Sequence, residues 1–125
     1  MTMRPGPSVP TIDVVSVDAR LKAVEEPAPL LLDVREQSEL AVVRAEGAVL
    51  APLSGLGAQV ASLPRDRPIF VICATGGRSA QVTGYLLANG WTDVSNVQGG
   101  TTAWVQAGLP IRRGVPDATE YELPD

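Results

Sequence analysis

The sequence contains no histidine, and this absence excludes several kinds of catalytic site. Ser–His and Cys–His catalysis both need an imidazole as the general base, and most zinc sites in proteins include at least one imidazole ligand. The sequence therefore predicts no metal centre, and nothing in it requires a cofactor.

Cysteine is almost as scarce, because Cys73 is the only one in the chain. A single cysteine cannot form an internal disulfide. Residues 1–7 carry one charged side chain and are followed by no apolar run, so we expect no signal peptide. Both observations favour a reducing compartment and predict that the protein is cytoplasmic.

The sequence also lacks a long apolar run and an excess of positive charge. No segment is long and apolar enough to span a bilayer, and a net charge of −4 with a pI near 4.7 argues against nucleic acid or an anionic membrane as partner. With 45% hydrophobic residues, the 125 residues predict one globular domain. We expect a flexible N-terminal arm (1–10), a folded domain (11–113) and an acidic C-terminal tail (114–125), extended or wrapped, with solvated acidic side chains.

Short, continuously apolar runs alternate with segments of helical periodicity. The runs predict five strands, at residues 14–15, 30–34, 48–50, 69–72 and 94–97, and Ser16 is a candidate N-cap for the first helix. Strands that are apolar on both faces are typical of a parallel sheet covered by helices on both sides, so we expect an α/β fold. Ligands bind such sheets beyond the carboxyl ends of the strands, where Asp33 and Cys73 both stand.

The segment that begins at Cys73 has the features of a reactive thiol site. It joins a predicted strand to a predicted helix, whose positive dipole end favours an anion. Gly76 and Gly77 can adopt positive φ and turn their N–H groups inward as an anion-binding nest, and Arg78 adds a cation with a planar fork. These features predict a thiolate nucleophile with a lowered pKa rather than the small buried hydrophobe that a lone cysteine often is.

The remaining candidate residues support this loop. We assign substrate binding and charge stabilisation to the rest of the loop, namely Ala74, Thr75, Gly76, Gly77, Arg78 and Ser79. Asp33 is expected to form a structural ion pair with Arg35, while a role for Arg35 in binding an anionic donor stays open. Gly99 and Gly100 predict a tight turn close to the loop, and Trp104 is expected to be a core residue.

Three motifs together resemble the single-domain rhodanese family of sulfurtransferases. They are Leu32-Asp33-Val34-Arg35-Glu36, the loop 73–79, and Gly99-Gly100-Thr101-Thr102-Ala103-Trp104 with Gly108-Leu109-Pro110, and the resemblance covers about residues 11–112. It implies a rhodanese-like fold, a five-stranded parallel sheet with helices on both faces. It also implies a ping-pong reaction, in which Cys73 takes a sulfane sulfur from a small donor such as thiosulfate and passes it as a persulfide to cyanide, a thiol or a protein acceptor.

Other cysteine-dependent functions fit the sequence less well than sulfur transfer. Cysteine-dependent phosphatases place five residues between cysteine and arginine, whereas four separate Cys73 from Arg78, so a phosphatase is disfavoured. The family's frequent Gly-His-Ile-Pro-Gly-Ala run is replaced by residues 43–48, which keep only the final Gly-Ala. Two alternatives stay open: a persulfide carrier or regulatory binding module without turnover, suggested by the sparse positive charge near the loop, and an arsenate-type reductase that uses an external thiol.

Overall fold

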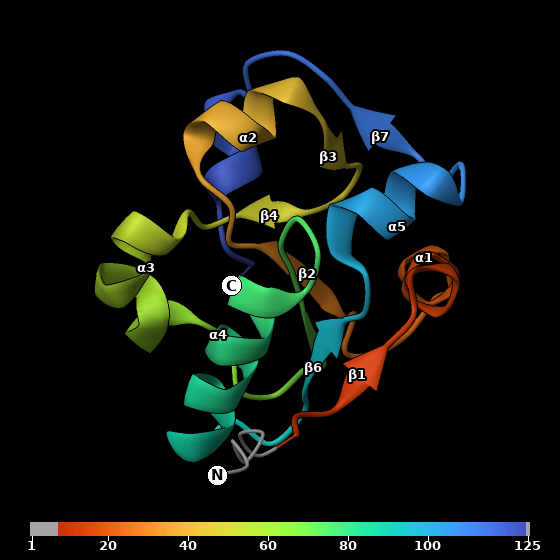
Figure 1. The fold of residues 1–125 in the computed structure, drawn as a ribbon. Coiled ribbons are helices and arrows are strands. Elements are labelled where there is room, and N and C mark those ends of the chain that lie inside the picture. Colours follow the sequence, from red (N-terminus) through yellow and green to blue (C-terminus); the bar gives the residue numbers. More distant parts are fainter. Residues whose placement is uncertain (1–7, 125) are drawn as a thin grey trace, which may run out of the picture.

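The computed structural model describes residues 8–124, so most of the predicted N-terminal arm (1–10) lies outside the described residues. Figure 1 shows the course of the chain. The elements in chain order are β1 (Thr11–Ile12), α1 (Val14–Lys22), β2 (Leu30–Asp33), α2 (Gln37–Val42), β3 (Arg44–Ala45), β4 (Val49–Leu50), α3 (Leu53–Gln59), a 3₁₀ turn (Val60–Ser62), β5 (Ile69–Ile72), α4 (Gly77–Ala88), β6 (Val94–Val97), α5 (Gly100–Gln106), β7 (Ile111–Arg112) and a second 3₁₀ turn (Ala118–Tyr121).

The main sheet has five strands in the order β1-β6-β5-β2-β4, and every neighbouring pair is parallel. This arrangement confirms the predicted α/β class and the five-stranded parallel sheet. In the register of the sheet, Asp33 at the end of β2 lies beside Ile72 at the end of β5. The residues that follow these two strands therefore emerge together at one edge of the sheet.

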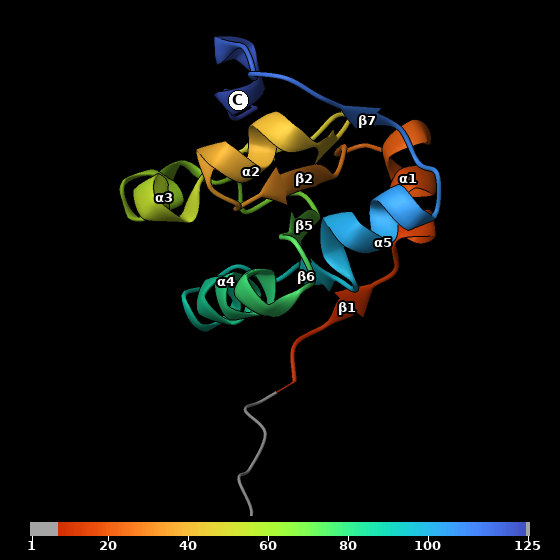
Figure 2. The ribbon, with the colours of Figure 1, turned by 45° about the horizontal axis from the view of Figure 1, so that its top comes forward.

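Helices cover both faces of the sheet, because alternate residues of each strand point to opposite sides. α3 and α4 lie on one face, and α1, α2 and α5 lie on the other (Figure 2). The core between the sheet and α3 and α4 includes Leu30, Leu32, Val71, Leu56, Val82 and Leu86. The core on the opposite face includes Leu31, Phe70, Ile72, Val17, Leu40 and Trp104, which confirms that Trp104 is a core residue.

The structure corrects the prediction for the first strand and the first helix. Val14 and Val15 do not form a strand but open α1, and the edge strand is the preceding pair, Thr11–Ile12. The N-cap of α1 is Asp13 rather than Ser16, since the Asp13 carboxylate accepts hydrogen bonds from the Ser16 amide and hydroxyl, each at 2.8 Å. A carboxylate at this position satisfies a free amide of the first helical turn.

The C-terminal segment folds back on α2, and its acidic side chains are not all solvated as expected. Glu120 forms an ion pair with the buried guanidinium of Arg44, with nitrogen–oxygen distances of 2.7 and 3.0 Å. Arg44 also donates to the carbonyl of Gly114 at 2.7 Å, and the Tyr121 hydroxyl donates to Gln37 of α2 at 2.6 Å. The tail is thus fastened to α2 and to Arg44 of β3. The boundaries at residues 10 and 113 stay predictions.

Candidate active site

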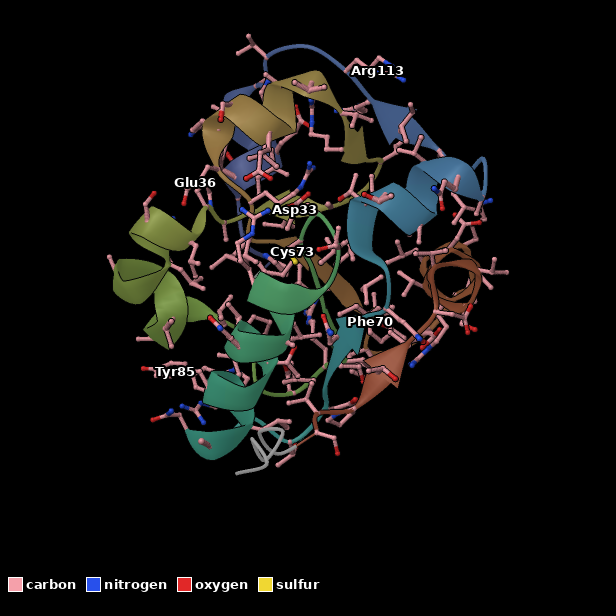
Figure 3. All side chains as sticks on the ribbon, in the orientation of Figure 1. Asp33, Glu36, Phe70, Cys73, Tyr85 and Arg113 are labelled. Atoms are coloured by element: carbon pink, nitrogen blue, oxygen red, sulfur yellow. The ribbon has the colours of Figure 1, made fainter. Side chains whose placement is uncertain are left out.

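Cys73 directly follows β5 at the carboxyl edge of the sheet (Figure 3). Its side chain is buried, with only 1% of the residue exposed, and its carbon atoms join the core beneath α4. The sulfur nevertheless faces polar hydrogens. Sγ accepts from the amide of Gly76 at 3.2 Å, from the amide of Ser79 at 3.3 Å and from the Ser79 hydroxyl at 3.2 Å. The structure therefore surrounds the sulfur with donors that stabilise an anion.

Two opposing effects set the pKa of the Cys73 thiol. Burial raises the pKa, because it removes water from the charged form. Hydrogen bonds from the Ser79 hydroxyl and from the amides of Ser79, Gly76 and Thr75 lower it, and together they outweigh burial. The net result is a pKa below that of an ordinary thiol, so a larger fraction of Cys73 is present as the nucleophilic thiolate at neutral pH.

The backbone of the loop depends on Gly76 more than on Gly77. Gly76 has φ +110°, a left-handed conformation that places it as the N-cap of α4, whereas Gly77 is already helical. The prediction of a positive φ is therefore confirmed for Gly76 and wrong for Gly77. Because α4 begins beside the sulfur, its first free amides are directed at Cys73.

The first turn of α5 fastens the other side of the loop. The amides of Thr101 and Thr102 donate to the carbonyls of Cys73 and Ala74 at 2.8 and 3.0 Å. Gly100 makes this approach possible, since a Cβ at that position would lie 2.3 Å from the Cys73 carbonyl oxygen. The predicted tight turn near the loop is confirmed. In a trans peptide the N–H points away from the C=O. Because these two carbonyls point towards α5, the N–H groups of the same peptides point towards the side of the sulfur.

Asn96 is a supporting residue that the sequence analysis missed. Its side-chain oxygen lies 2.5 Å from the Ser79 hydroxyl, and its amide nitrogen donates to the carbonyl of Gly76 at 3.1 Å. Asn96 thus links β6 to both ends of the donor set around the sulfur. The signal was present, because an asparagine that is buried in a central strand requires hydrogen-bond partners.

Arg78 is held in an ion pair with Glu39, and its predicted role in binding a substrate anion stays a prediction. Both of its terminal nitrogens donate to the two carboxylate oxygens of Glu39 in α2, each at 2.7 Å. This ion pair ties the Cys73 loop to α2. It also lowers the pKa of Glu39 to about 2, mainly through the hydrogen bond with Arg78, so the carboxylate stays ionised at neutral pH.

Asp33 and Arg35 form the expected structural ion pair beside the loop. The Arg35 guanidinium lies 2.9 Å from the Asp33 carboxylate and donates to the Val43 carbonyl at 2.8 Å. Both side chains are buried, with exposed fractions of 5% and 0%. Arg35 is therefore engaged by the protein itself, which supports a structural role for it.

Two pockets lie on either side of the loop. One, of about 230 Å³, is a mostly apolar groove between α3 and α4, and it includes Leu53, Leu56, Val82, Tyr85 and Arg78. The other, of about 300 Å³, lies against α5 and includes Arg35, Ala74 and Thr101. Within residues 8–124, no group of three or more acidic or cysteine side chains is placed to hold a metal ion, and no helix combines the length and apolar character required to cross a bilayer.

Comparison with known proteins agrees with this geometry. The model of the rhodanese-like domain matches residues 16–107. A sulfurtransferase of Allochromatium vinosum is 35% identical over 100 residues, which are 80% of this chain and 92% of that protein. The probable adenylyltransferase/sulfurtransferase MoeZ of Mycobacterium tuberculosis is 38% identical over 82 residues, but these are 64% of this chain and only 21% of that longer protein.

A solved structure has the same fold. The solution structure of the rhodanese-like domain of the Anabaena protein Alr3790 superimposes with a TM-score of 0.74 at 30% identity, covering 93% of this chain and 88% of that one. The family match extends over most of the chain and includes β2, the Cys73 loop and α5. The chain belongs to the family of rhodanese-like domains.

Proposed function

We propose that the protein is a sulfurtransferase in which Cys73 carries a sulfane sulfur from a small donor to an acceptor. Sulfur transfer in general is supported by the family and by a relative named as a sulfurtransferase. The proposal adds the nucleophile, the persulfide intermediate and the type of donor. The observation that carries it is the set of three donors within 3.3 Å of the Cys73 sulfur, at the carboxyl end of a parallel strand.

The reaction has two steps. In the first, the Cys73 thiolate attacks the outer sulfur of a donor such as thiosulfate, a sulfur–sulfur bond forms, and the donor's own sulfur–sulfur bond breaks to release sulfite. In the second, cyanide or a thiolate attacks the terminal sulfur of the persulfide and restores the Cys73 thiolate. The amides of Gly76 and Ser79 stabilise the negative charge on the sulfur at the start and end of this cycle.

Formation of thiocyanate from thiosulfate and cyanide tests the proposal. We expect turnover by the wild-type protein and none by Cys73→Ser, because serine is not ionised under these conditions and cannot hold a transferable sulfur. Circular dichroism and thermal unfolding of the variant serve as the control for folding. Thiocyanate production that continues in Cys73→Ser contradicts the mechanism.

A second candidate function is a persulfide carrier that does not turn over with small molecules. The burial of Cys73 and the neutralisation of Arg78 by Glu39 favour it, since both limit the approach of a small anion. Mass spectrometry of protein treated with a sulfur donor separates the two functions. A carrier retains one added sulfur atom on Cys73 in the presence of cyanide and releases it to an acceptor protein, whereas an enzyme loses it to cyanide.

A further inference from the structure

The positive charge of Arg78 is neutralised by Glu39 in the protein without substrate. Glu39 binds the end of the guanidinium with both carboxylate oxygens, which is the geometry that the carboxylate- or sulfonate-like part of a donor would otherwise use. The pair is only partly buried, with exposed fractions of 36% for Arg78 and 32% for Glu39. An incoming anion therefore meets an ion pair with no net charge.

Arg35, the other arginine near the loop, is ion-paired as well. Arg35 lines the pocket beside Ala74, but its guanidinium is paired with Asp33. Within the part of the chain that the structure describes, both arginines that line the pockets on either side of the loop are thus ion-paired. The attraction for an anion near Cys73 comes from amides and the helix dipole, which are partial charges.

We propose that Glu39 is a specificity-determining residue, which masks the charge of Arg78 and makes Cys73 discriminate against dianionic reactants in favour of those with less negative charge. This inference rests on the proposed function for its biological meaning, but the electrostatic effect itself applies to any reaction of the Cys73 sulfur. Thiosulfate is a dianion, whereas organic thiosulfonates and persulfides carry one negative charge or none.

The size of the effect follows the charge of the reactant. Coulomb repulsion by the Glu39 carboxylate is proportional to that charge, so the rate factor for a dianion is the square of the factor for a monoanion. Replacing Glu39 by glutamine removes the repulsion. The amide oxygen can still accept from the Glu36 amide and from one nitrogen of Arg78, while the second hydrogen bond from Arg78 is lost. For the thiolate form of Cys73, we expect rate gains of about 3-fold for a monoanion and about 10-fold for a dianion, and none for a neutral reactant.

Alkylation of the single cysteine provides a test that does not require turnover. Iodoacetate and iodoacetamide react with the same thiolate but differ by one negative charge, so the ratio of their rates is independent of the Cys73 pKa. Glu39→Gln should raise the ratio of the iodoacetate rate to the iodoacetamide rate about 3-fold at low salt. The gain should shrink at about 1 M salt, where the screening length is roughly 3 Å. Glu39→Asp, which keeps the charge, should stay near the wild-type ratio.

Glu46→Gln is the matched control, because Glu46 is an exposed residue in the turn between β3 and β4 and its replacement changes the net charge equally. An unchanged ratio in Glu39→Gln, or an equal rise in Glu46→Gln, overturns the inference.

Sulfur transfer from thiosulfate and from methanethiosulfonate completes the experiment, since these donors differ by one charge and release sulfite and methanesulfinate respectively. Glu39→Gln should raise kcat/KM for thiosulfate about 3-fold more than for methanethiosulfonate, and equal changes for both donors contradict the inference. If the wild-type protein accepts sulfur from neither donor, the proposed function fails, while the alkylation ratio still decides the role of Glu39.

Discussion

Replacement of Ser79 by alanine removes the one side-chain hydroxyl that donates to the Cys73 sulfur among the described residues. The Ser79 hydroxyl lies 3.2 Å from Sγ, and the amides of Gly76 and Ser79 remain in place in the variant. A hydrogen bond to a charged group contributes about 1.5–3 kcal/mol. Because burial of Cys73 acts in the opposite direction, loss of this donor should raise the pKa of the thiol.

The rate of alkylation by iodoacetamide measures this change directly, since Cys73 is the only cysteine in the chain. The rate rises with pH to a plateau, whose midpoint reports the pKa and whose height reports access to the sulfur. We expect the midpoint for Ser79→Ala to move to higher pH with the plateau unchanged. At pH values below both midpoints, the variant should react about 10-fold more slowly, the equivalent of about 1.4 kcal/mol.

Thr83→Val is a matched control for this measurement. Thr83 is buried one turn further along α4, and its hydroxyl donates to the Ser79 carbonyl rather than to the sulfur. Its midpoint should equal that of the wild-type protein. A midpoint for Ser79→Ala that stays the same or moves to lower pH would refute the reasoning, because it would show that the hydroxyl does not stabilise the thiolate.

Three further predictions concern stability, each measured as the free energy of unfolding in urea. Glu39 has a pKa of about 2, below its ordinary 4.5, so its contribution is complete above pH 4.5 and is lost as the pH falls towards 2; Glu39→Gln should therefore be less stable at pH 7 and lose less stability on acidification. Gly100→Ala should lower the free energy of unfolding by about 3 kcal/mol, because the residue has positive φ and its new Cβ would overlap with the loop carbonyls. Gly108 also has positive φ but lies in open space, so Gly108→Ala should cost only about 1 kcal/mol. Glu120→Ala leaves the buried guanidinium of Arg44 without a counter-ion and should cost about 3 kcal/mol. Glu122→Ala, at an exposed residue of the same segment, should leave the free energy of unfolding nearly unchanged.

Local sequence patterns were sufficient for the central strands and for the candidate nucleophile. Residues 30–33 and 69–72 are continuous runs of mostly apolar residues that the sheet buries on both faces, and an apolar run of this length predicts such a strand directly. Residues 94–97 keep apolar side chains only at Val94 and Val97, but a helix stop before them and a glycine turn after them mark the strand. Cys73 and Gly76 were recognisable because a strand, a glycine turn and a helix follow each other without interruption. In these segments, neighbours in the chain are also neighbours in space.

The parts that were missed depend on contacts between distant residues. Arg78 pairs with Glu39, and Arg44 pairs with Glu120, and no pattern in one sequence indicates which acidic residue reaches which arginine. The two-residue strands β3 and β7 likewise form only because a segment near residue 111 returns to one near residue 45. At the N-terminus, Val14 and Val15 are strong strand formers, yet the cap at Asp13 directs them into a helix.

The Ser79 hydroxyl has two acceptors within reach, the Cys73 sulfur and the side-chain oxygen of Asn96, but it has only one hydrogen to give. When the sulfur is ionised, that hydrogen can rotate towards it; when the sulfur carries its own proton, the hydroxyl can turn to Asn96 and accept from the thiol instead. A rotation about a single carbon–oxygen bond is therefore enough to suit either protonation state. The surrounding main chain need not move as the sulfur gains and loses its charge.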